Sequence, residues 1–214
     1  MRSLHLKRTR GMLWESICFF GMWEDVMADG TIAAAYLGDI VRTYHNYKAL
    51  SEKAIAQIRN DADLHAQIDP DSNSVAVIVK HLAGNLRSRF RDFLTADGEK
   101  PDRQRDAEFE MPERISRAEM LRWWDEAWAI TLNTLESLKP GDLQKTVYIR
   151  GEGFLAIEAL NRNATHTAYH VGQIVYLARH FTAPEWKSLS IPKGKSAEYA
   201  QGDFKAKGIA RTNP

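Results

Sequence analysis

Four long segments of the chain repeat their apolar residues at steps of three and four, and this periodicity constrains the fold more than any other feature. The segments are residues 31–60, 74–95, 116–138 and 155–180. Such spacing places the apolar side chains on one face of an α-helix, and no proline interrupts any of the four segments. Amphipathic helices joined by short connections bury these faces against antiparallel neighbours. The sequence therefore predicts an all-α fold, an up-and-down type four-helix bundle.

Turn and capping residues separate the four predicted helices. The run Asp-Pro-Asp-Ser-Asn at 69–73 breaks the helical pattern, and Ser72 or Asn73 can cap the second helix. Ser116, with a glutamate three residues later, forms a capping box that opens the third helix. The polar connection at 95–115 is long for a compact domain, so it is either functional or mobile, and it permits a crossover.

A short β-hairpin near 145–154 precedes the fourth predicted helix. Residues 146–149 alternate between polar and apolar in the manner of a strand, and Arg150-Gly151-Glu152-Gly153 has the composition of a tight turn. A two-stranded hairpin is only marginally stable alone.

The predicted bundle occupies residues 31–186 and has a different kind of sequence on either side. Residues 1–30 are basic and then aromatic-rich, and they are either an unstructured or artefactual extension or a short amphipathic helix that docks on the bundle. Residues 187–214 are rich in lysine and glycine and have little to bury, so we expect a loosely attached tail.

The composition excludes several classes of partner and site. Lys+Arg number 29 and Asp+Glu 28, a net charge of +1 that gives no bulk attraction to nucleic acid or to an anionic membrane. Cys18 is the only cysteine, so there is no internal disulfide and no Cys-rich zinc site. No apolar run reaches the ~20 residues that span a bilayer, and the stretch from Gly11 to Trp23 lacks a clean signal-peptide cleavage site. We expect a cytoplasmic protein with no nucleic-acid partner and no membrane partner.

Three of the seven histidines occupy positions that suit a metal ion. His166 and His170 are four residues apart in the fourth predicted helix, so both imidazoles lie on one face. His81 lies near the apolar stripe of the second predicted helix, and its nitrogen can reach the same ion if the two helices pack side by side. Neutral imidazole suits zinc, nickel, iron and copper. The spacing alone is a weak signal, because an H-x-x-x-H pair often arises by chance.

Two stretches of the sequence resemble DinB-like, YfiT-like proteins. One is residues 73–85, Asn-Ser-Val-Ala-Val-Ile-Val-Lys-His-Leu-Ala-Gly-Asn, and the other is residues 159–173, which contain Tyr-His-Val-Gly-Gln. The likeness extends over about residues 31–195 and points to a bacterial subfamily of unknown function. The resemblance implies a four-helix bundle, often a homodimer, whose divalent metal ion (zinc, nickel or iron) is held by one histidine on the second helix and an H-x-x-x-H pair on the fourth. The matching positions are His81, His166 and His170.

Two function classes fit such a site. The first is a metal-dependent enzyme, because three protein ligands leave coordination positions open. It would be a hydrolase or, as the resemblance implies, a low-molecular-weight thiol S-transferase acting on a small-molecule substrate. The second is a non-catalytic metal-binding protein or a dimeric interaction scaffold. A carboxylate of the 95–115 loop can still complete the ligand shell, and the candidates are Asp102, Asp106 and Glu108.

Polar residues near the predicted site leave further alternatives. Three amides within about one turn of the histidines either hydrogen-bond a ligand imidazole or a metal-bound water, or are ordinary surface amides: Asn85, Asn163 and Gln173. Three arginines alternate along the second predicted helix: Arg87, Arg89 and Arg91. We favour a solvated face with local ion pairs for these arginines over a grip on an anionic substrate group.

Overall fold

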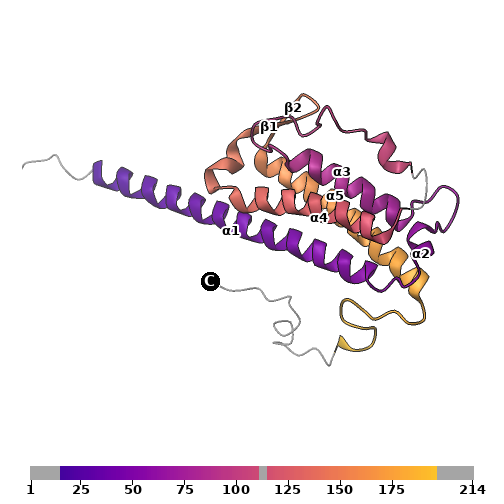
Figure 1. Ribbon diagram of the computed structural model, residues 1–214. Coiled ribbons are helices and arrows are strands. Elements are labelled where there is room, and N and C mark those ends of the chain that lie inside the picture. The colour runs from indigo at the N-terminus through magenta and orange to yellow at the C-terminus, as the bar shows by residue number, and fades with distance from the viewer. Residues whose placement is uncertain (1–14, 111–114, 197–214) are drawn as a thin grey trace, which may run out of the picture.

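A computed structural model describes residues 15–110 and 115–196, with side chains from residue 32 onward. The long helices are α1 (Glu15–Ile55), α3 (Val75–Phe90), α4 (Arg117–Ser137) and α5 (Ala156–Thr182). The shorter elements are α2 (Asp61–His65), the 3-10 helices η1 (Asp106–Phe109) and η2 (Pro140–Gln144), and the strands β1 (Thr146–Ile149) and β2 (Glu152–Leu155). The predicted fold class, a helical bundle with a small antiparallel hairpin, is confirmed (Figure 1).

The four long helices form a ring in which α1 packs on α5, α5 on α3, α3 on α4 and α4 on α1. Helices α1 and α5 run in one direction and α3 and α4 in the other (Figure 1). The hydroxyl of Thr134, near the end of α4, accordingly donates to the carbonyl of Phe90, the last residue of α3, at 3.0 Å. Neighbours α3 and α4 are therefore parallel, so this pair departs from the predicted up-and-down order, and the long loop between them is the crossover that the sequence permitted. Neighbours α3 and α5 are antiparallel, which matters for the site below.

The predicted helices differ from the observed ones mainly at their ends. The first helix ends at Ile55 rather than near residue 60, and α2 follows it, capped by the side chain of Asn60. The cap of α3 is Ser74, whose hydroxyl accepts from the amide of Val77, one residue beyond the predicted caps. Helix α3 ends early because the next residue is extended and Asp92 has a φ of 51°. The cap of α4 at Ser116 is confirmed.

Helix α1 begins at Glu15 and continues without a break past residue 31, where the domain was predicted to start. Residues 1–14 and 197–214 lie outside the described part of the chain, so the predicted extension and tail remain predictions. Of the described helices, none combines the length and the apolar composition that crossing a bilayer requires.

Large aromatic side chains fill the centre of the bundle. Tyr44, Trp124 and Trp128 are fully buried. The ring of Tyr44 meets Trp128 at 6.0 Å and Phe90 at 5.6 Å between centroids, both nearly edge-on. Such edge-to-face packing joins α1, α3 and α4 in one core. Both tryptophans therefore belong to the core.

The hairpin is tied to the loop that follows α3. Its turn consists of Arg150 and Gly151, with φ of 58° and 76°, the conformation of a two-residue turn that follows the twist of the strands. The carboxylate of Asp97 accepts from the backbone amides of both turn residues, at 2.9 and 2.7 Å. The amide of Gly98 donates to the carbonyl of Tyr148 at 2.7 Å. The tip of the hairpin is thereby held against the end of α3.

Candidate metal centre

The antiparallel pair α3 and α5 brings His81, His166 and His170 together. One ligand nitrogen of each histidine lies within 4.8 Å of those of the other two. Nε2 of His81 is 3.2 Å from Nε2 of His166. Two nitrogens that bind one zinc ion at about 2.0–2.1 Å and tetrahedral angles are roughly 3.3–3.4 Å apart. The cluster therefore has the dimensions and the donor set that suit one divalent ion.

A buried carboxylate orients His81. Nδ1 of His81 lies 2.8 Å from Oε2 of Glu108, and Arg103 donates to the same carboxylate from Nε at 2.8 Å and from Nη2 at 2.9 Å. Burial raises the pKa of Glu108, but the hydrogen bonds from His81 and Arg103 and the charge of Arg103 outweigh it and hold this pKa below its usual value. An ionised carboxylate only accepts, so Nδ1 of His81 donates to it and Nε2 is the nitrogen that faces the cluster.

A second acceptor orients His170. Nδ1 of His170 donates to Oε1 of Gln173 at 2.8 Å, which again leaves Nε2 for a ligand. Of the two alternatives that the sequence left for Gln173, the contact with a histidine is the correct one. Nδ1 of His166 is buried and has no hydrogen-bond partner among the described residues.

The surroundings keep two of the histidines neutral. Burial, and then the nearby charges of His170 and His81, lower the pKa of His166 to about 4. Burial also lowers the pKa of His170. Both imidazoles are therefore uncharged at neutral pH, the form in which histidine binds a metal ion.

Of the three carboxylates proposed to complete the ligand shell, one contacts a histidine of the cluster, but not as a further ligand. Asp102 is exposed and pairs with Arg87 and Arg91 on the surface, and Asp106 is almost fully exposed. Glu108 contacts the far nitrogen of His81 instead of joining the ligand nitrogens. Within the described residues, the group with ligand geometry contains the three histidines alone.

Asn85 and Asn163 are not surface amides, and among the described residues they hydrogen-bond each other rather than a histidine. They are buried, and Nδ2 of Asn163 donates to Oδ1 of Asn85 at 2.8 Å across the α3–α5 interface. Oδ1 of Asn163 accepts from the hydroxyl of Tyr44 at 2.8 Å and from that of Thr167 at 3.3 Å. The two amides thus join three helices directly beside the histidines.

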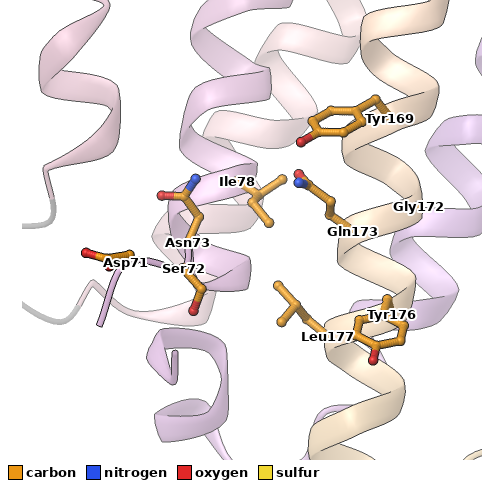
Figure 2. A pocket seen from close by; sticks show the side chains of 9 residues that line it. All are labelled: Asp71, Ser72, Asn73, Ile78, Tyr169, Gly172, Gln173, Tyr176 and Leu177. Atoms are coloured by element: carbon orange, nitrogen blue, oxygen red, sulfur yellow. The ribbon is translucent and has the colours of Figure 1, made fainter. Parts of the chain in front are cut away.

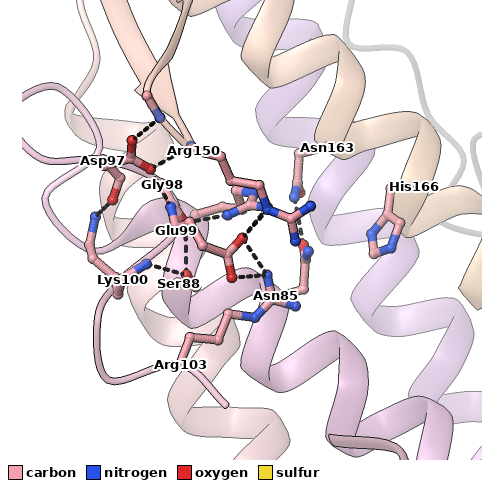
Figure 3. Close-up of polar contacts among 12 residues, drawn as sticks. Asn85, Ser88, Asp97, Gly98, Glu99, Lys100, Arg103, Arg150, Asn163 and His166 are labelled. Atoms are coloured by element: carbon pink, nitrogen blue, oxygen red, sulfur yellow. Dashed lines mark hydrogen bonds and ion pairs between the residues drawn. The ribbon is translucent and has the colours of Figure 1, made fainter. Parts of the chain in front are cut away.

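Two cavities lie next to the cluster. The larger, about 530 Å³, opens between the start of α3 and the middle of α5, and it meets the site through Gln173, with Tyr169 and Tyr176 exposed at its edge (Figure 2). The smaller, about 170 Å³, is lined by His81 and His166 themselves. The asparagine pair and Arg150 also line the smaller cavity (Figure 3). We regard the smaller cavity as the route to the cluster, because the histidines form its wall.

Comparison with known proteins places the chain in a family. Residues 31–195, most of the chain, match a family described as "Protein of unknown function (DUF1572)". The chain belongs to this family. The three histidines of this DUF1572 protein and both acceptors that orient them lie within the matched residues. No curated protein and no solved structure matches the chain. Family membership therefore carries no activity, and the function has to be argued from the site.

Two elements of the site were missed by the sequence analysis. Arg103 was not considered, although it lies in the 95–115 loop together with the carboxylate that it holds. Gly84 was not considered either. A Cβ at this position would lie 2.2 Å from Oε1 of Glu108, so the glycine lets the loop approach α3. A glycine inside a predicted helix, one turn after a candidate ligand, was the available signal.

Proposed function

We propose that this DUF1572 protein binds one divalent metal ion through His81, His166 and His170 and is a metal-dependent enzyme of the DinB-like type. The observation that carries the proposal is the convergence of three imidazoles, two of them held by outer acceptors on Nδ1. Outer acceptors of this kind fix ligand orientation in metal sites. Zinc, nickel and iron are the ions that suit such ligands.

The residues of the site support catalysis rather than a closed structural site. A divalent ion with three protein ligands supplies a Lewis acid that lowers the pKa of water or of a thiol. His81 and His166 line a cavity, so a small molecule can approach the ligand side of both rings. Glu108 and Gln173 keep their histidines from turning, and Arg103 keeps Glu108 ionised.

Two chemistries are proposed for this site, hydrolysis and the transfer of a low-molecular-weight thiol. The resemblance to DinB-like thiol transferases supports the second. A panel of small electrophilic substrates, assayed with and without added low-molecular-weight thiols, separates them. Turnover that requires the thiol indicates a transferase, and turnover without it indicates a hydrolase.

Metal content tests the proposal directly. We expect about one equivalent of zinc, nickel or iron in protein purified without a His-tag, and loss of this metal in the His81→Ala, His170→Ala double variant. A suitable control is His45→Ala, because His45 is half-exposed on α1, pairs with Glu136 of α4 and is not part of the cluster. Elemental analysis of the three proteins gives the result.

The outcome that contradicts the proposal is a wild-type protein that holds no metal even after reconstitution with each of the three ions. A metal that is present but supports no turnover, and whose removal sharply lowers the melting temperature, would favour the non-catalytic alternative. The His166→Ala variant separates these cases, since a catalytic role predicts an intact fold without activity.

A further inference from the structure

The cavity beside the histidines is strongly positive. Among the residues that the structure describes, five arginines and no carboxylate line it: Arg89, Arg103, Arg105, Arg150 and Arg162. The carboxylates that pair with these arginines are Glu99 and Glu108 behind the wall and the exposed Asp106. The chain as a whole is nearly neutral, at +1, so this excess of positive charge is a local feature.

One carboxylate, Glu99, is shared among three of these guanidinium groups. It accepts from Arg89 at 3.0 Å, from Arg150 at 3.1 Å and, at 3.4 Å, from Arg103 (Figure 3). The ion pairs expected for Arg89 are thus present, yet the same side chain also faces the cavity. Arg150 contacts Glu99 through Nε, and its two terminal nitrogens have no partner among the described residues. A guanidinium with both terminal nitrogens available binds an oxyanion through two parallel hydrogen bonds.

The backbone fixes the direction of Arg150. Residues other than glycine rarely adopt its φ of 58°. This backbone conformation is stabilised by Asp97, which accepts hydrogen bonds from both amides of the turn. The side chain extends over Glu99 towards the asparagine pair, with His166 beyond that pair (Figure 3). An exposed arginine is normally mobile, but this one leaves a restrained turn and is tethered at Nε.

A neutral donor completes the wall. Oδ1 of Asn85 accepts from Asn163, whose own oxygen is taken by Tyr44, so the chain of hydrogen bonds sets the orientation of the Asn85 amide. Its Nδ2 has no hydrogen-bond partner among the described residues, although the side chain is only 7% exposed and lines the cavity. This amide donor is therefore available to an acceptor in the cavity.

We infer that this arginine-lined cavity binds the oxyanion group, a carboxylate or a phosphate, of a small substrate and so places the rest of that substrate at the histidine cluster. The inference rests on the proposed function for the chemistry that follows, whereas binding of the anion itself needs no metal. The cavity of about 170 Å³ is smaller than the roughly 300–1,000 Å³ of pockets that enclose drug-sized ligands. It suits a small acid or the anionic end of a larger molecule.

Calorimetric titration at low ionic strength tests the inference, with inorganic phosphate and succinate as the two probes. Wild type, Arg150→Gln and Arg87→Gln are compared, each metal-free and zinc-loaded. Arg87 is the matched control, because it lies on α3 but is exposed and faces Asp102, away from this cavity. We expect Arg150→Gln to weaken binding by about tenfold or more, and Arg87→Gln to change it by less than about twofold.

Binding of phosphate alone or of succinate alone supports the inference and names the anionic group. The inference is overturned if wild type binds neither phosphate nor succinate, or if Arg150→Gln and Arg87→Gln weaken binding equally. Zinc content measured on the same samples separates this inference from the proposed function. Anion binding in a protein that takes up no zinc would support the anion site and contradict the metal proposal. Zinc uptake without anion binding would support the metal proposal and contradict the anion site.

Discussion

Replacing Glu108 by alanine is expected to lower the free energy of unfolding by about 3–5 kcal/mol and to weaken metal binding by about 10- to 100-fold. The side chains of Glu108, Arg103 and His81 are 8%, 4% and 4% exposed. Without the carboxylate, the guanidinium of Arg103 stays buried, loses its two hydrogen bonds to Glu108 and keeps only the longer contact with Glu99 at 3.4 Å. A buried charge without its partner costs far more than the pair contributes when intact. At the same time Nδ1 of His81 loses the acceptor that fixes the ring.

Two further variants give this prediction its contrast. Glu108→Gln keeps the shape and one acceptor but removes the charge, so its losses should fall between those of wild type and Glu108→Ala. Glu110→Ala changes an exposed side chain two residues away, where Lys80 binds only the backbone carbonyl, and should have little effect. Denaturant unfolding measures the stability, and competition with a chelator measures zinc affinity. If Glu108→Ala behaves like Glu110→Ala, the carboxylate does not hold the histidine.

Arg103 belongs to both halves of the site. It holds the carboxylate that orients His81, and it also lines the cavity to which we assign anion binding. It contacts Glu99 as well, which in turn holds Arg89 and Arg150. The 95–115 loop therefore supplies both part of the cavity wall and the carboxylate that holds His81. The sequence alternative of a functional loop agrees with these contacts better than that of a mobile one.

The helices could be predicted from the sequence because each carries a long apolar stripe, and periodicity of this kind survives small errors in the ends. Likewise, the spacing of His166 and His170 fixes their common face without knowledge of the rest of the fold. The pairing of α3 with α5 could not be obtained in this way. The length of the loop allows a crossover but does not determine which helices become neighbours. The prediction that His81 joins the cluster depended on α3 packing against α5.

Contacts made by the irregular segments could not be predicted, because they follow no period. Asp97 and Arg150 are 53 positions apart, and no local sequence pattern indicates that they meet. Arg103 and Glu108 are close in sequence, but their burial depends on the loop lying against α3. Charged side chains in and beside a polar loop are normally solvated, so we predicted surface ion pairs for the arginines at the end of the second predicted helix. For Arg87 and Arg91 the structure has such pairs, both with Asp102.

Gly84→Ala is expected to destabilise the protein by about 1–3 kcal/mol and to weaken zinc binding by about tenfold or more. The added Cβ would lie 2.2 Å from Oε1 and 2.7 Å from Cδ of Glu108. A flexible carboxylate could normally swing away, but Arg103 and His81 hold this one from the other side. The loop itself must then shift, and the contact with His81 is lost together with the close packing.

Gly172→Ala on α5 is the matched control, and its effect should have the opposite sign. Gly172 is exposed within the helix, and a Cβ there would meet no heavy atom within 4 Å. Alanine in a helix interior is more stable than glycine by roughly 0.5–1 kcal/mol, so this variant should be the more stable protein and keep its zinc affinity. Urea unfolding and chelator competition on both variants decide the matter. A Gly84→Ala variant that gains stability like Gly172→Ala would mean that Glu108 moves freely, and the argument that it positions His81 would have to be withdrawn.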